Sequence, residues 1–149
     1  MEHLMKLEEI HEHWAKDSKI NTLDMAGESV NTPKLHGKYL QIMSTERMKL
    51  RQLREHKKEL IRVKTDYYMG RLDREEMTSR GWEPFAMRLL KNDVPTYLDG
   101  DSDIIKVNLQ IGVQEEKVDV LESIIKIISN RGFSIKSYID WKKFENGLG

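Results

Sequence analysis

The sequence has no cysteine and no long apolar run. Without thiols the chain can form neither disulfides nor thiolate metal sites, which agrees with a reducing compartment. No apolar stretch approaches the roughly 20 residues that a membrane span requires, so we expect no membrane contact. Hydrophobic residues make up 38% and charged residues 34% of the 149 residues. We therefore expect a thin core, built from helices that lie side by side and complete their burial against other copies.

Motifs for catalysis, cofactors or metals are also missing. There is no glycine-rich phosphate loop and no nucleophile elbow, so we expect neither an enzyme nor a bound cofactor. His11 and His13 lie two residues apart and point away from each other on a helix, which argues against a metal site. Asp99 begins a pattern like a calcium loop, but Ile104 replaces the sixth-position glycine and Gln110 the twelfth-position glutamate.

Charge, in contrast, is abundant and unevenly distributed, although the net charge is zero. Residues 1–33 hold three basic and seven acidic side chains, a balance of −4, and residues 34–64 hold ten and three, a balance of +7. Residues 65–149 hold twelve and fifteen, a balance of −3. A concentrated basic block is what contact with a polyanion requires. A solvated helix face is the alternative interpretation.

The spacing of apolar residues predicts a mainly helical fold. We expect a short amphipathic helix over residues 3–16, a loop from Asp17 to Pro33, and a helix of about 30 residues that begins after Pro33 and ends at Gly70. Residues 73–79 are expected to form a helical turn and residues 94–96 a connecting segment.

The last third of the chain contains one ambiguous segment. Residues 105–111 alternate apolar and polar side chains, which by itself indicates a strand, but Gly112 follows at once and no second strand is available to pair with it. Beyond it, the spacing predicts a helix over residues 113–130 and a final aromatic helix from Ser134. These two helices are candidates for assembly surfaces or for the core of a monomer.

The long predicted helix separates into two faces when its residues are wound at 100° each. One face about 100° wide is apolar and is expected to be buried; it carries Tyr39, Ile42, Met43, Leu50, Leu53, Leu60, Ile61 and Tyr68. Beside it, a strip about 80° wide and about 22 Å long carries five basic residues, here called the basic ridge: Arg47, Arg51, Arg54, Lys58 and Arg62. Glu55 and Glu59 lie off its edge. Like charges in a row repel, which favours a track for phosphates over a solvated face.

Two further lysines and two tyrosines stand near the end of this helix. Lys57 and Lys64 fall on the apolar face, so we expect their ammonium groups to reach water or nucleic acid. Tyr67 is a candidate for stacking on DNA bases, because aromatic rings beside basic groups bind single strands in this way. Packing at the helix end is the alternative for Tyr67, and it is what we expect for Tyr68.

Two strings of the sequence are fairly specific: Asp66-Tyr67-Tyr68-Met69-Gly70-Arg71 and Arg131-Gly132-Phe133-Ser134-Ile135-Lys136. Together with weaker strings in order along nearly the whole chain, they resemble the UvsY family of recombination mediators from T-even-type phages. The family's DNA-binding motif reads Leu-Lys-Ala-Arg-Leu, and its two basic positions fall on Arg62 and Lys64, with lysine and arginine exchanged and Thr65 at the end. The charges survive the exchange, although the geometry of contact differs between the two side chains.

The resemblance implies a predominantly helical homo-oligomer, a heptameric ring, that binds single-stranded DNA in the cytoplasm of an infected host cell. It also implies a mediator that helps the phage recombinase displace the single-strand-binding protein. Helix from about Asn108 is then favoured over the strand. We expect residues 1–101 to form a helical DNA-binding region and residues 102–149 a C-terminal helical bundle that oligomerises. The acidic segment before the basic block could bind a partner or shield the block.

The DNA contacts predicted from the ridge and the resemblance together are Arg47, Arg51, Arg54, Lys57, Lys58, Arg62, Lys64 and Tyr67. Because Arg62 and Lys64 differ by about 200° on a regular helix, they cannot grip one phosphate path. A helical scaffolding protein and a regulator that binds duplex DNA are the competing interpretations.

Overall fold

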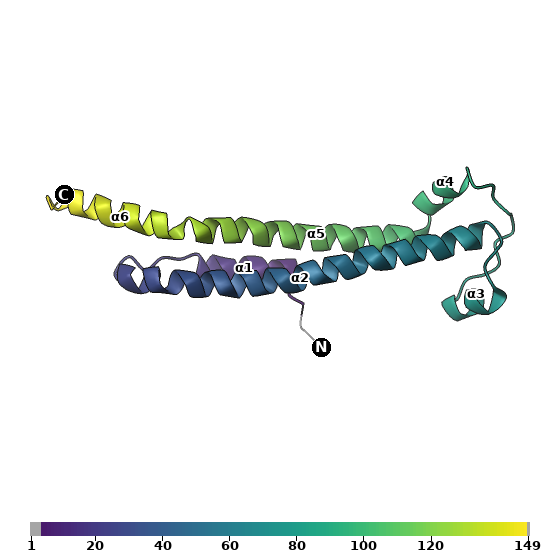
Figure 1. The fold of residues 1–149 in the computed structure, drawn as a ribbon, viewed down its shortest axis with the longest axis horizontal. Helices are drawn as coiled ribbons and strands as arrows, with labels where there is room; N and C mark the ends of the chain where they lie inside the picture. The colour runs from purple at the N-terminus through teal and green to yellow at the C-terminus, as the bar shows by residue number, and fades with distance from the viewer. Residues whose placement is uncertain (1–3, 149) are drawn as a thin grey trace. The chain divides into compact units, whose positions relative to one another are not determined.

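The computed structural model describes residues 4–148, and all regular structure within that range is helical (Figure 1). The helices are α1 (Leu7–Asp17), α2 (Met25–Tyr68), α3 (Arg74–Arg80), α4 (Val94–Asp99), α5 (Ser102–Ser129) and α6 (Arg131–Glu145). The chain divides into two compact units. The first unit holds Met1–Met48 and Val113–Gly149, and the second unit holds Lys49–Gly112. This division cuts both α2 and α5 and does not coincide with the expected boundary between residues 101 and 102.

The predicted start of the long helix after Pro33 is wrong, because α2 begins at Met25. Asp24 terminates the preceding loop: its Oδ1 accepts the Gly27 N–H at 3.1 Å and its carbonyl accepts the Glu28 N–H at 3.0 Å. Pro33 lies inside the helix, where it removes one backbone donor. The cap at Asp24 thus outweighs the boundary signal of the proline.

The end of α2 at Gly70 is confirmed. Gly70 has a φ of 72°, in the left-handed region that glycine adopts without strain. The Arg71 N–H donates to the Asp66 carbonyl at 2.8 Å and the Gly70 N–H to the Tyr67 carbonyl at 3.2 Å. These two bonds form a Schellman motif, which satisfies carbonyls that the helix end would otherwise leave free.

The core of the first unit is built where α1, α2 and α5 meet. It comprises Ile10, Leu35, Tyr39, Met43, Leu121, Ile124 and Ile128. Trp14 packs edge-on against Tyr39, whose hydroxyl donates to Asp17 at 2.9 Å. Burial opposes the charge on Asp17, but hydrogen bonds from Tyr39 and Lys38 outweigh it and lower the pKa of this carboxyl below its ordinary 3.8.

The strand interpretation of residues 105–111 is wrong, since this segment belongs to α5. The helix begins at a good cap: Asp101 Oδ1 accepts the backbone N–H groups of Asp103 at 2.9 Å and Ile104 at 3.1 Å. Buried positions then recur every three or four residues, at Ile104, Val107, Ile111, Gln114, Val118 and Leu121. Over seven residues, such a spacing is easily mistaken for the two-residue period of a strand.

The remaining helices differ more from the elements that the sequence predicts. The expected turn at residues 73–79 is α3, the expected connecting segment at residues 94–96 lies in α4, and α6 starts at Arg131 instead of Ser134. Arg131 is buried and donates to the carbonyls of Ser18 and Lys19 and to the Glu28 carboxylate at 2.7 Å. This side chain ties the start of α6 to the segment that joins α1 and α2.

Candidate nucleic-acid interface

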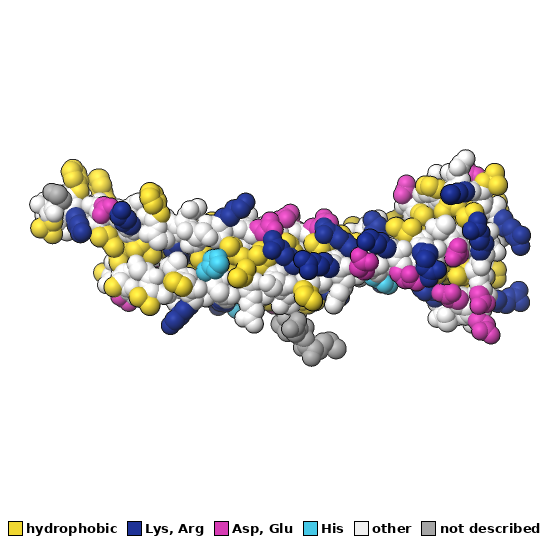
Figure 2. Space-filling model, viewed as in Figure 1, with side chains coloured by type: hydrophobic (Ala, Val, Ile, Leu, Met, Phe, Trp, Pro, Cys, Tyr) yellow, Lys and Arg dark blue, Asp and Glu magenta, His cyan; other side chains and the backbone are white. Residues whose placement is uncertain are grey.

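The five residues of the basic ridge are all exposed on α2. Arg47 lies in the first unit, and the other four, Arg51 to Arg62, lie in the second. On the face drawn in Figure 2, Lys and Arg side chains are interspersed with acidic ones. Whether acidic side chains also reach the basic ridge is decided by its individual ion pairs.

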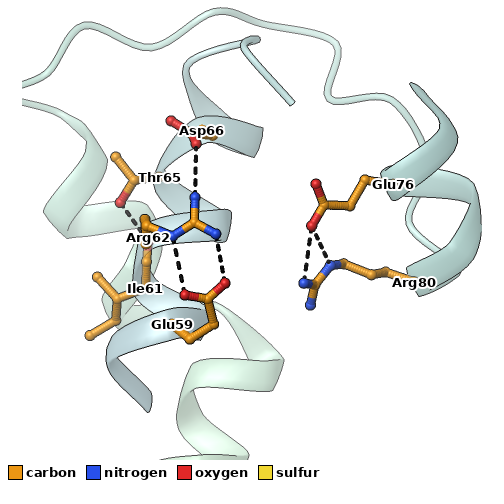
Figure 3. A network of polar contacts seen from close by, with 7 residues as sticks. All are labelled: Glu59, Ile61, Arg62, Thr65, Asp66, Glu76 and Arg80. Carbon is orange, nitrogen blue, oxygen red and sulfur yellow. Dashed lines mark hydrogen bonds and ion pairs between the residues drawn. The ribbon is translucent and has the colours of Figure 1, made fainter. Parts of the chain in front are cut away.

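Acidic side chains do reach the basic ridge from one turn away. Lys58 pairs with Glu55 at 2.9 Å, and the Arg62 guanidinium pairs with Glu59 at 2.6 Å, with Asp66 at 3.9 Å on its other side (Figure 3). The hydrogen bond from Arg62 lowers the pKa of the Glu59 carboxyl. Winding at 100° per residue placed Glu55 and Glu59 off the edge but ignored the reach of glutamate and arginine side chains.

The cations of the basic ridge differ in whether an acidic side chain pairs with them. In the first unit, Arg47 pairs with Glu122 of α5 at 2.5 Å. Within residues 4–148, no acidic side chain pairs with Arg51. A phosphate would have to displace a carboxylate at Arg47, Lys58 or Arg62, but not at Arg51.

Lys64 lies inside the second unit, with only 6% of its side chain exposed. Its Nζ is 3.0 Å from Asp101 and 2.9 Å from Asp103, and it sits 3.9 Å from the centroid of the Trp82 ring. The expectation that this ammonium reaches water is wrong, because two carboxylates and an indole ring replace its hydration. Lys64 would have to leave this site to contact a phosphate.

Asp101 is the centre of this buried group. It accepts the Tyr68 hydroxyl at 2.5 Å besides pairing with Lys64. Burial by itself disfavours the charge on Asp101, but hydrogen bonds from Tyr68, Lys64 and the Ile104 N–H overcome it and lower the pKa of the carboxyl. Burial and the bond to Asp101 raise the pKa of the Tyr68 hydroxyl. The expected packing of Tyr68 at the helix end is confirmed.

Tyr67 and Lys57 are both half-buried. The Tyr67 ring lies 5.2 Å from Tyr68 and 5.4 Å from Trp82, and its hydroxyl donates to the Glu83 carbonyl at 2.5 Å. This ring belongs to an aromatic cluster of the second unit, and its stacking on DNA bases stays a prediction.

A second buried charge, that of Glu46 in the first unit, was not predicted from the sequence. Glu46 is 1% exposed and pairs with Lys117 at 2.8 Å, while the Gln114 amide donates to the Glu46 carboxylate and carbonyl. Its position could have been noticed, because Glu46 falls in the middle of the predicted apolar face. Its partners on α5 could not have been identified without the fold.

The described residues form neither a membrane-spanning helix nor a metal cluster. No helix among residues 4–148 is long and apolar enough to cross a membrane. In the same range, no three histidine or acidic side chains gather as a metal site would require.

Comparison with known proteins identifies the family. Residues 13–148 match the model of the family described as "Recombination, repair and ssDNA binding protein UvsY". The chain belongs to the UvsY family. A relative, the recombination protein uvsY of Enterobacteria phage T4, is 29% identical over 143 residues, which cover 96% of this chain and 99% of the relative.

Solved structures agree with that assignment. A crystal structure of the bacteriophage T4 recombination mediator protein UvsY matches with a TM-score of 0.82 at 27% identity and covers 94% of this chain and 99% of the other. Another lattice type of the same protein matches with a TM-score of 0.82 at 28% identity, covering 95% of this chain and 98% of the other. The helical fold of this chain is thus the fold of a UvsY protein, and the family resemblance in the sequence is confirmed.

Proposed function

We propose that this UvsY-family chain is a non-enzymatic recombination mediator that binds single-stranded DNA along the basic ridge. It promotes loading of a recombinase onto DNA covered by single-strand-binding protein, in the cytoplasm of an infected host cell. The observation that carries the proposal is the run of exposed cations on α2 in a chain of this family. Spaced along one helix face, they suit the neutralisation of successive phosphates without reading base sequence.

The ion pairs of the basic ridge explain why such binding would be weak for each subunit. A phosphate that contacts Lys58 or Arg62 replaces Glu55 or Glu59, so part of the gain is offset by the lost pair. Weak contacts at each subunit suit a mediator, which has to release DNA to the recombinase. Several subunits in one assembly would restore overall affinity, because linked sites act at a high effective concentration.

The surface of α6 supports self-association. Phe133, Trp141 and Phe144 are 76%, 59% and 71% exposed, and Figure 2 shows hydrophobic side chains standing out from this helix. They fall within about 80° of one another on the helix, opposite its buried side. Exposed apolar side chains gathered on one face are typical of an interface. We propose that this face joins copies of the chain in a ring-like homo-oligomer, with seven subunits as the family resemblance implies.

The decisive experiment compares single-stranded and duplex oligonucleotides over a salt series, with wild type and an Arg51→Ala/Arg62→Ala variant. We expect preference for the single strand, and a salt slope that is flatter by about 1.4 in the variant, since each lost phosphate contact changes the slope by about 0.7. The control is Lys16→Ala/Lys126→Ala, which removes two exposed cations outside the ridge and should leave binding unchanged.

The outcomes separate the candidate functions. Duplex preference would indicate a duplex-binding regulator, and no binding at low salt would indicate a scaffolding protein.

For mediation itself, wild type should shorten the lag before a recombinase filament forms on DNA covered by single-strand-binding protein. The ridge variant should lose this effect while its mass by sedimentation stays that of the oligomer. A change in mass would mean that the ridge is an interface between subunits.

A further inference from the structure

The second unit contains an open cleft of about 360 Å³, at the lower end of the size range of small-molecule sites. Its floor is apolar, formed by the buried side chains of Leu60 on α2 and Val107 on α5. Its walls are polar and aromatic. They are formed by His56, Arg80, Trp82, Asp103, Lys106 and Gln110.

One wall of the cleft is the indole of Trp82, and its position is fixed on several sides. Gly81, with a φ of 72°, ends α3, and the Trp82 N–H donates back to the Met77 carbonyl at 2.9 Å. The ring then meets Lys64 Nζ at 3.9 Å and the Arg80 guanidinium carbon at 5.2 Å from its centroid. Trp82 remains half-exposed and lines the cleft. Lys64 is buried, so a base that stacks on the indole would take the place of the exposed Arg80 side chain over the ring.

The remaining walls supply the groups that a nucleotide needs. His56, Arg80 and Lys106 are exposed donors or cations suited to phosphate. Arg80 pairs with Glu76 at 3.1 Å (Figure 3), so a phosphate there would replace this carboxylate. Asp103 and Gln110 offer acceptors, and Gln110 also offers donors, for the edge of a base. One carboxylate oxygen of Asp103 binds Lys64, yet 45% of the side chain is exposed. An apolar floor, an aromatic wall and hydrogen-bonding groups together match the two faces and polar edge of a nucleobase.

We infer that this cleft takes one unstacked base of bound single-stranded DNA, with the Trp82 indole as the stacking surface and the cations contacting the adjoining phosphates. The inference rests on the proposed binding of single-stranded DNA and adds a second kind of contact to it. The basic ridge neutralises phosphates, whereas the cleft holds a base. Duplex DNA cannot offer an unpaired base, so the cleft would contribute to preference for the single strand.

The test uses two oligonucleotides of equal length, one with bases and one made abasic, which keeps every phosphate. Wild type should bind the abasic strand at least about fivefold more weakly, since stacking on an aromatic side chain is sensitive to loss of the base. Trp82→Leu should lower affinity for the ordinary strand to that of the abasic one. Trp82→Phe should retain an intermediate preference, and Arg51→Ala should weaken both strands equally.

Fluorescence gives a second readout, in which Trp82 itself is retained. In a Trp14→Phe/Trp141→Phe chain, Trp82 is the sole tryptophan, and the ordinary strand should quench it while the abasic strand should not. Equal affinity of wild type for both strands, or no quenching by the ordinary strand, would overturn the assignment of the cleft and leave ridge binding intact. No binding of either strand would overturn the proposed function with it.

Discussion

Arg62 and Lys64 stand two residues apart on α2 and have opposite fates. The Arg62 side chain is 62% exposed and pairs with acids on its own helix, whereas that of Lys64 is 6% exposed and pairs with Asp101 and Asp103. The resemblance in the sequence predicts both as DNA contacts. The difference shows that a cation in a basic stretch can be part of the folded core instead of the exposed surface. Its position around the helix decides between the two.

The exposed face of α2, which carries Arg62, and its buried face, which carries Lys64, also differ in how easily a phosphate can replace the carboxylate of an ion pair. A carboxylate on the exposed face competes with water and salt, so a phosphate can replace it. A buried cation has no such freedom, because its carboxylate partners would be left desolvated and unpaired. Lys64 is therefore best understood as a residue that positions Trp82 and the start of α5, and Arg62 as a candidate DNA contact.

The largest effect should follow from changing the buried lysine. Lys64→Met keeps the length of the side chain but leaves Asp101 buried without its cation, so we expect the free energy of unfolding to fall by about 3–5 kcal/mol. Urea denaturation followed by circular dichroism measures this. Lys57→Met, at a half-buried site on the same face, should change stability by less than about 1 kcal/mol. A Lys64→Met protein of full stability that had lost single-strand binding would restore Lys64 as a DNA contact.

Acid should destabilise the chain through the same buried group. The pKa of Asp101 in the folded state lies below its ordinary 3.8, so on acidification the unfolded state takes up its proton first. This contribution is complete at neutral pH and is lost as the pH falls below about 4 and through the folded pKa. Thermal melting between pH 6 and pH 3 should show the loss, and Asp101→Asn, though less stable at pH 6, should lose less on acidification. An equal slope in both proteins would contradict the prediction.

The smallest effect is expected on the exposed face. Glu59→Gln removes the nearer of the two acidic partners of Arg62, so single-stranded DNA should bind more tightly, with a salt slope steeper by up to about 0.7. Fluorescence anisotropy of a labelled oligonucleotide measures both quantities, while thermal stability should hardly change. Glu116→Gln, an exposed acid on α5, removes the same charge elsewhere and controls for net charge. If both variants bind equally, the ion pair does not compete with DNA.

Much of the fold could be predicted from the sequence because helices carry their own signals. The apolar face of α2 from Tyr39 to Tyr68, the end at Gly70 and the mainly helical class were all readable from local spacing. The mistakes arose where two local signals disagreed. Pro33 appeared to start a helix that Asp24 had already capped, and a short alternation at residues 105–111 concealed a spacing of three and four.

The site was harder to predict than the fold, because the residues that contact one another there lie far apart in the sequence. Whether a lysine on an apolar face reaches water depends on what the fold brings opposite it. Asp101, the partner of Lys64, lies far along the sequence, on the other side of α3 and α4. The same holds for Trp82 and the cleft around it, whose walls come from three separate segments. The DNA contacts of the basic ridge stay a prediction.

The two buried charges of α2 have opposite signs, and this bears on how copies of the chain avoid pairing wrongly. Glu46 faces Lys117, and about five helical turns further on Lys64 faces Asp101. If α2 met an α5 of another copy in parallel, Lys64 would face Lys117 and Glu46 would face Asp101, so both contacts would become repulsive in a desolvated environment. A slipped antiparallel alignment would leave all four charges buried without partners. In the homo-oligomer that we propose, these two sites would favour one orientation and one alignment wherever an α2 meets an α5.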